Sequence, residues 1–282
     1  MKNTIPELDK LFEEVGIYSN SSDYQELLDF IKKFPGMAPY NAMLVHVQKP
    51  GSQFVANARD WMRKFGRKPI AGARPLVILR PFGPVSFVFE LNDTEGEPFP
   101  EKLLEPFKAD GDVPESKVEA LMKGILFEGI ESVEQEYGTS LAGYVQAIHE
   151  TREYKTLNKT ELYNVCFGMV INKNLDSTAK IATIFHELGH VFCGHVRQQK
   201  ATWLPKRDEI HIKEREFEAE SVCWLLCERM GIKNPSAEYL SHYLGSNKEI
   251  PFISIDAVLK ATAMIESIMA GKSAPRKELL VK

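Results

Sequence analysis

The sequence predicts an α+β protein, because helical and strand periodicities follow one another in its second half and a hairpin lies in its first half. Apolar residues recur every three or four positions over residues 181–192, which indicates a helix with one buried face. Residues 163–171 instead alternate between apolar and other side chains, which is the period of a strand. Two further strands, 75–80 and 85–90, flank a turn that contains Pro and Gly. We therefore expect a small mixed sheet and a helix-rich N-terminal region that carries a β-hairpin.

Proline, glycine and serine mark the expected ends of the other elements. Helices are predicted near residues 5–15, 23–34, 40–48 and 57–65. Helical patterning resumes near residues 115–136 and 139–150. Residues 90–120 carry ten acidic and three basic side chains with four prolines, which predicts a linker or an extended surface segment.

Residues 186–190 read His-Glu-Leu-Gly-His and lie within the predicted helix 181–192, for which Asp176 and Ser177 are candidate N-caps. Two histidines four residues apart project from nearly the same side of a helix, so both rings can bind one metal ion. Glu187 is too close in sequence to His186 to chelate comfortably with it, but it can reach a water molecule at such a site as a general base. The motif predicts a zinc hydrolase. The alternative is a pair of core histidines.

A catalytic zinc site takes three protein ligands and leaves a fourth position open. His195 lies one residue too early for the third histidine of a metzincin, so we expect it at the surface, beside the ligands or in substrate binding. The better candidate is Glu216, at the start of a helix expected over residues 213–230 and ended by Gly231. His195, together with the later Tyr239, His242 and Tyr243, is also a candidate oxyanion stabiliser.

Two carboxylates of this second helix lie on one stripe with small and apolar residues. The stripe comprises Glu216, Ala219, Glu220, Cys223, Leu226, Cys227 and Met230. Because buried carboxylates need partners, we expect Glu216 to bind the metal. Glu220 would accept the outer ring N–H of a ligating histidine and fix its tautomer. Glu218 is expected on the opposite, partly buried side, paired with Arg215, and a charged solvated face suits Glu218 better than Glu216.

These residues resemble a known group of proteins. The helix His186-Glu187-Leu188-Gly189-His190 followed by Glu216-Phe217-Glu218-Ala219-Glu220 is similar to the ImmA/IrrE-type metalloproteases and to the related catalytic domain of ArdC-type antirestriction proteins. The resemblance covers roughly residues 160–245 and implies a gluzincin-like zincin with a HExxH active-site helix. It implies Glu216, three residues before the Ala of the second helix, as third ligand. Family members often have Asn where this chain has Glu220.

The resemblance also implies an activity. We expect a zinc-dependent endopeptidase, with Zn²⁺ as cofactor, that cleaves a helix-turn-helix transcriptional repressor in a bacterial stress, DNA-damage, mobile-element or anti-phage response and is stimulated by single-stranded DNA. The alternative is a single-stranded DNA-binding antirestriction-type effector with a structural zinc site. Glu187 favours the enzyme, because a structural site has no use for a base beside its ligands. The expected division is 1–110 for the N-terminal region with its basic segment, 111–150 for connecting helices and 151–282 for the metallopeptidase domain.

A basic segment between residues 59 and 80 has seven basic side chains and one acidic, a local charge of +6. Trp61, Phe65 and Phe82 lie among these cations, a combination that single-stranded nucleic-acid grooves use for phosphate attraction and base stacking. We hypothesise a DNA-binding surface here, and an accidental basic surface is the alternative. Its candidate residues are Arg59, Arg63, Lys64, Arg67 and Lys68.

The strand 163–171 offers a further hypothesis. Zincins commonly present an edge strand beside the metal, along which a peptide substrate can add. Cys166 on the second face of the strand would then face the cleft, where its thiolate could occupy the fourth zinc position as an inhibitory ligand. An inert, half-buried thiol is the alternative. For Cys223 and Cys227, which share a helix face, we expect core packing and keep metal chelation as the alternative.

Composition limits the remaining choices. The chain has 282 residues, 44% hydrophobic side chains and a net charge of −4, which describes an ordinary globular protein without a bulk charge for nucleic acid. Neither a signal-peptide pattern nor an apolar run of membrane length is present, so we expect a cytoplasmic protein without a membrane partner. In that compartment, the four cysteines are expected to be reduced thiols.

Overall fold

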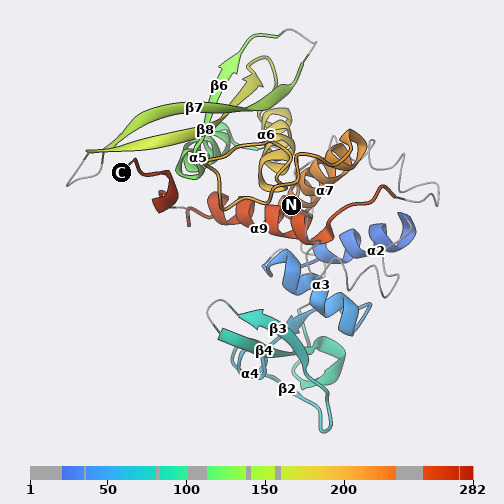
Figure 1. Ribbon diagram of the computed structural model, residues 1–282. Helices are drawn as coiled ribbons and strands as arrows, with labels where there is room; N and C mark the ends of the chain where they lie inside the picture. The colour runs from blue at the N-terminus through green and yellow to red at the C-terminus, as the bar shows by residue number, and fades with distance from the viewer. Residues whose placement is uncertain are drawn as a thin grey trace.

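The computed structural model describes residues 21–34, 36–80, 83–100, 113–137, 141–155, 160–232, 250–272 and 274–281. Figure 1 shows a sheet at one end of the molecule, a group of helices in the middle, and a small unit of strands and one helix at the opposite end. Strands and helices are therefore segregated, and the expected α+β class is confirmed. Among the described helices, none is long and apolar enough to cross a membrane. The division of the chain at residues 110 and 150 stays a prediction.

The main sheet is small and mixed, with strand order β6-β8-β7. β8 (Thr160–Asn172) confirms the predicted strand, and it lies parallel to β6 (Ile130–Gln135) and antiparallel to β7 (Gly143–Lys155). β8 is thus the middle strand, so the expectation that a peptide could add along it is wrong, because both of its hydrogen-bonding edges are already paired. The free edge beside the motif helix belongs to β7.

The helices expected between residues 115 and 150 are only partly correct. α5 (Glu115–Ile125) and the short 3-10 helix η3 (Leu126–Glu128) end at Gly129, whose φ of +73° turns the chain into β6. Residues 143–150, expected to be helical, belong to β7, because they pair with β8 from Gly143 onward. Local patterning cannot report this pairing, since the partner strand lies elsewhere in the sequence.

The two helices that carry the candidate metal ligands occur where the sequence predicts them. α6 (Ser177–Phe192) is capped at its N-terminus by Asp176, whose side chain accepts the N–H of Ala179 at 2.8 Å. α7 (Ile212–Met230) ends at Gly231, which has a φ of +68°. Both helices pack against α9 (Ile255–Met269), and a 3-10 helix η4 (Lys277–Leu279) lies beside β8.

The N-terminal helices and the hairpin also follow the prediction. α2 (Ser21–Lys32), α3 (Pro39–Gln48) and α4 (Ala58–Phe65) correspond to three of the expected helices, while the predicted helix 5–15 lies outside the described residues. β3 (Leu76–Arg80) and β4 (Gly83–Glu90) form the predicted hairpin. The remaining elements of this unit are β1 (Val55–Ala56), β2 (Arg67–Pro69), η1 (Leu91–Asp93) and β5 (Thr94–Gly96).

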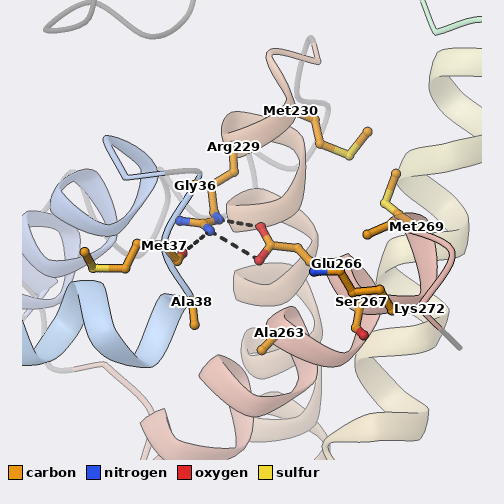
Figure 2. A pocket seen from close by; sticks show the side chains of 11 residues that line it. Gly36, Met37, Ala38, Arg229, Met230, Ala263, Glu266, Ser267, Met269 and Lys272 are labelled. Atoms are coloured by element: carbon orange, nitrogen blue, oxygen red, sulfur yellow. Dashed lines mark hydrogen bonds and ion pairs between the residues drawn. The ribbon is translucent and has the colours of Figure 1, made fainter. Parts of the chain in front are cut away.

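A buried arginine joins the N-terminal helices to the C-terminal ones. The guanidinium of Arg229 on α7 pairs with Glu266 of α9, with Nε at 2.6 Å from Oε1. It also donates to the carbonyl oxygens of Ile31, Phe34 and Met37 at 2.7–3.0 Å. Figure 2 shows the ion pair in the wall of a pocket between α9 and the segment 36–38. Since Arg229 is only 3% exposed, these partners compensate its lost hydration.

Replacing Arg229 by leucine should lower the free energy of unfolding by about 3–5 kcal/mol, because the carbonyl groups of Ile31 and Phe34 lose their donor while staying buried and the partly buried Glu266 loses its partner. Urea unfolding followed by circular dichroism measures the change. The matched control is Lys123→Leu on α5, whose ion pair with Glu119 is exposed and whose loss should cost at most about 1 kcal/mol. Equal destabilisation in the two variants would contradict the structural role of Arg229.

Candidate metal centre

Helices α6 and α7 bring the three predicted ligands together. The Nε2 atoms of His186 and His190 lie 3.1 Å apart, and each lies 3.5 Å from a carboxylate oxygen of Glu216. The two histidines come from adjacent turns of α6, as the motif requires, while Glu216 projects from the first turns of α7. The ligand atoms of all three residues lie within 4.8 Å of one another.

The geometry and the chemistry of this cluster fit a zinc ion. Ligand atoms at about 2.0–2.1 Å from a tetrahedral zinc lie about 3.3–3.4 Å from one another, close to the separations of 3.1 and 3.5 Å found here. Two imidazole nitrogens and one carboxylate form a donor set that zinc enzymes use. The site also stabilises positive charge: burial lowers the pKa of His186, but the carboxylates of Glu216 and Glu220 outweigh it and raise this pKa to about 10.

The outer side of the His186 ring faces Glu220, as the stripe argument predicts. Oε1 of Glu220 lies 3.3 Å from Nδ1 of His186, and its Oε2 is buried without a hydrogen-bond partner among the described residues. A hydrogen on Nδ1 of His186 would therefore be held by Glu220, which leaves the Nε2 lone pair directed toward His190 and Glu216. The role of Glu220 in metal binding stays a prediction.

Glu187, the candidate general base, lies buried between the three candidate metal ligands and the edge of the sheet. The backbone N–H of Val145 on β7 donates to its carboxylate. Burial raises the pKa of Glu187, and the neighbouring His186 and His190 only partly oppose this. The structure therefore places a proton-accepting side chain, two candidate ligands and the free edge of β7 next to one another.

Glu218 contradicts the sequence analysis, because it is fully buried, whereas the side chain of Glu216 is 37% exposed. Glu218 pairs with Arg207 instead of Arg215, through two contacts of 2.5 Å. Arg215 donates to the carbonyl oxygens of Ile210 and Asp208. The stripe argument failed here because α7 is buried on nearly all sides over residues 217–227, so no solvated face existed to receive Glu218.

His195 lies neither at the surface nor in the ligand cluster, but between His190 and Glu218. Its Nδ1 is 3.0 Å from Nδ1 of His190, and its Nε2 is 2.9 Å from Oε2 of Glu218. Gly194, with a φ of +81°, turns the chain after α6 and so places His195 beside His190. This glycine is a sequence signal for the turn that the sequence analysis did not use. With the buried Cys193, His195 and Glu218 form a second group whose ligand atoms lie within 4.8 Å of one another.

Cys166 is not brought to the metal cluster. It is fully buried in the core, and burial raises the pKa of its thiol. The expected inhibitory ligand therefore has no support in the structure, because residues 165–167 are buried on both faces of β8 and Cys166 is not among the described residues that cluster with His186 and His190. Cys223 and Cys227 are buried as well, with Sγ of Cys223 donating to the carbonyl oxygen of Ala182 at 3.3 Å, as expected for core packing.

The basic segment is divided between structural and exposed cations. Arg67 donates to both oxygens of Thr94 and to the carbonyl of Glu97, while Lys64 and Lys68 pair with Asp60 and Glu95. Arg59 and Arg63 on α4 are exposed, with no ion-pair partner in the described part of the chain.

Trp61 and Phe65 are packed against other rings and are not available for base stacking, contrary to the hypothesis. Trp61 is fully buried, its Nε1 donates to the carbonyl of Phe89, and its ring packs with Phe54, Phe65 and Phe99. These rings form the core of the small unit around α4, because so small a unit has few other apolar side chains to bury. Phe82, Tyr239, His242 and Tyr243 lie outside the described residues.

Gly189 sets the distance between the two helices of the metal cluster. A Cβ atom on Gly189 would lie 3.0 Å from Cα of Ala219. Replacing Gly189 by leucine should therefore push α7 away from α6, cost about 1–3 kcal/mol of stability and weaken metal binding by moving Glu216. Gly189→Ala should have a smaller effect on both quantities. Thermal unfolding and the metal content after dialysis measure them, and full metal retention by Gly189→Leu would refute this control of the ligand geometry.

Comparisons with known proteins gave a family match for part of the chain. Residues 160–230 match the peptidase M78 family model, described as an IrrE N-terminal-like domain, and these residues comprise β8, α6 and α7. A comparison with curated proteins gave no match. Among solved structures, the metal-free crystal structure of the antirestriction protein ArdC from plasmid R388 aligns at 16% identity over 88% of this chain and 98% of its own, with a TM-score of 0.37. The resemblance to ImmA/IrrE-type metallopeptidases is confirmed by the family match of residues 160–230.

Proposed function

We propose that this chain is a zinc-dependent endopeptidase with a gluzincin-like catalytic domain. The observation that carries the proposal is the position of Glu187, a buried carboxylate beside a cluster of two histidines and a glutamate with zinc-like spacing. A purely structural metal site needs no such proton acceptor. The match of residues 160–230 to a metallopeptidase family supports the same reaction class.

The roles of the residues follow from their positions. His186, His190 and Glu216 would hold the zinc, which when bound would polarise the carbonyl of the scissile peptide and acidify a water molecule. Glu187 would accept the proton of the attacking water at its carboxylate and later give it to the leaving amine. The N–H of Val145 keeps this carboxylate oriented while the proton moves. Glu220 would hold the His186 ring from behind.

The edge of β7 is the proposed substrate-binding element. Asn172 of β8 donates to the carbonyl of Ala142 at 2.8 Å, so in this antiparallel pair the main-chain groups of residues 143, 145 and 147 point away from β8. The N–H of Val145 is taken by Glu187, so an extended segment of a protein could add along this edge through the groups of residues 143 and 147 and the carbonyl of Val145, which would bring a peptide bond next to Glu187. We propose a transcriptional repressor of the helix-turn-helix type as substrate, as the family resemblance implies. Such a protein encoded beside this gene is the first one to assay.

Glu187→Gln should retain zinc and lose about 10²–10⁴-fold in the rate of repressor cleavage, because the amide cannot accept the proton. Zinc content by elemental analysis and cleavage by gel electrophoresis measure the two effects separately. His186→Ala is the matched control and should lose both zinc and cleavage. Full activity in the zinc-loaded Glu187→Gln protein would reject the general-base role.

We further propose that single-stranded DNA stimulates the peptidase by binding at the exposed Arg59 and Arg63. These two residues lie one turn apart on α4, in the small unit at the opposite end of the molecule from the sheet (Figure 1). Because Trp61 and Phe65 pack into the aromatic core of this unit, phosphate attraction without stacking on these two rings is the expected mode. The alternative function, a DNA-binding effector with a structural zinc site, rests on the same two cations.

Reversing both charges, in Arg59→Glu with Arg63→Glu, should weaken oligonucleotide binding and reduce its salt dependence by about 0.7 in log–log slope for each lost phosphate contact. Fluorescence anisotropy across a salt series measures this. The control is Lys117→Glu with Lys123→Glu on α5, which makes the same change of net charge elsewhere. Equal losses in both double variants would refute a localised site, and DNA binding without any cleavage would favour the effector.

A further inference from the structure

We propose that His195 is a positioning residue that holds the His190 ring through a buried chain of hydrogen bonds ending at Arg207. The chain runs from His190 through His195 and Glu218 to Arg207. This inference rests on the proposed metal site and deepens it, because it assigns a function to a buried histidine that the catalytic scheme does not use.

The positions of the ring hydrogens follow by elimination. If His190 binds a metal through Nε2, its single N–H is on Nδ1, which lies 3.0 Å from Nδ1 of His195. That atom of His195 must then accept. A neutral imidazole has only one N–H, so the hydrogen of His195 is on Nε2, at 2.9 Å from the carboxylate of Glu218. Every donor in this chain thus has an acceptor.

Glu218 suits its place between His195 and Arg207, because each of its hydrogen-bond partners donates to it. Arg207 contacts both carboxylate oxygens, and the backbone N–H of Ser254 donates to Oε1 at 2.7 Å. Because each group that contacts its two oxygens is a donor, Glu218 accepts the hydrogen bond from His195 as well, which places a hydrogen on Nε2 of His195.

The backbone around His195 is fixed as firmly as its side chain. The N–H of His195 donates to the carbonyl of His190 at 2.9 Å, and the N–H of Arg207 donates to the carbonyl of Gly194 at 3.0 Å. A Cβ atom on Gly194 would lie 2.1 Å from the carbonyl oxygen of Pro205, so the segment after α6 packs directly on the segment that carries Arg207. Both ends of the hydrogen-bond chain are therefore held against the last turn of α6.

The two candidate histidine ligands are thus oriented in different ways. Glu220 contacts the outer nitrogen of His186 directly, whereas the outer nitrogen of His190 contacts His195, which in turn contacts the carboxylate of Glu218. An imidazole that accepts on one side and donates on the other transmits the orientation set by Glu218. Without it, the His190 ring is free to adopt the other tautomer or to rotate, and zinc affinity should fall.

Two conservative replacements distinguish a hydrogen-bonding role of His195 from a role in packing alone. In His195→Asn, the side-chain oxygen can replace Nδ1 as acceptor for His190 but cannot reach Glu218. In His195→Gln, the side-chain nitrogen can replace Nε2 as donor to Glu218 but offers no acceptor to His190. We expect zinc affinity, measured by chelator competition, to fall about 10–100-fold in His195→Gln and to fall less in His195→Asn, which keeps the acceptor for His190 and loses only the contact with Glu218. The reverse order, or equal affinities, would overturn the proposal.

A second measurement uses the unaltered chain and needs no peptidase activity. In protein labelled with ¹⁵N-histidine, long-range ¹H–¹⁵N spectra report which ring nitrogens carry hydrogen. Hydrogen on Nε2 alone of His195, in both the metal-free and the zinc-loaded protein, supports the relay, and hydrogen on Nδ1 or on both nitrogens overturns it. A chain that binds no zinc yet shows this tautomer would refute the proposed function while the relay stands.

Discussion

The close approach of α6 and α7 is the constraint on which the candidate site depends. Gly189, in the middle of the histidine motif, lies against Ala219, and the absence of a side chain there lets Glu216 come within 3.5 Å of both histidines. Because packed helix interfaces adjust poorly to added volume, this one contact fixes a ligand geometry that neither helix specifies alone. Gly189 therefore determines the geometry of the site together with the three candidate ligands.

Burying this geometry requires compensation of charge at several points. Glu218, His195 and Arg207 form one neutralised group behind His190, and Arg229 with Glu266 forms another between α7, α9 and the N-terminal helices. In each group an arginine offers several fixed donors, which satisfy a carboxylate and nearby carbonyl oxygens together. The helices around the metal cluster are therefore held by directional polar contacts as well as by apolar packing, which suits a site that must keep its ligands in place.

The candidate metal ligands and the exposed arginines lie in different parts of the molecule. The candidate metal ligands lie near the edge of β7, where we propose that the substrate binds, while the exposed Arg59 and Arg63 lie in the small unit at the other end of the molecule (Figure 1). α2 and α3 connect the two, and Arg229 binds the carbonyl groups that follow α2.

The sequence by itself determined the elements whose signals are local: the capped helix 177–192 with its two histidines, the helix ended by Gly231, the strand 160–172 and the hairpin. It also placed Glu216 and Glu220 correctly around His186, because helical spacing alone puts them on one stripe. Only the tertiary structure decided that 143–150 is a strand, that Cys166 and Trp61 are core residues, and that Glu218 is buried against His195 and Arg207. Strand pairing and the choice between two buried helix faces depend on partners distant in sequence, and local periodicity carries no information about them.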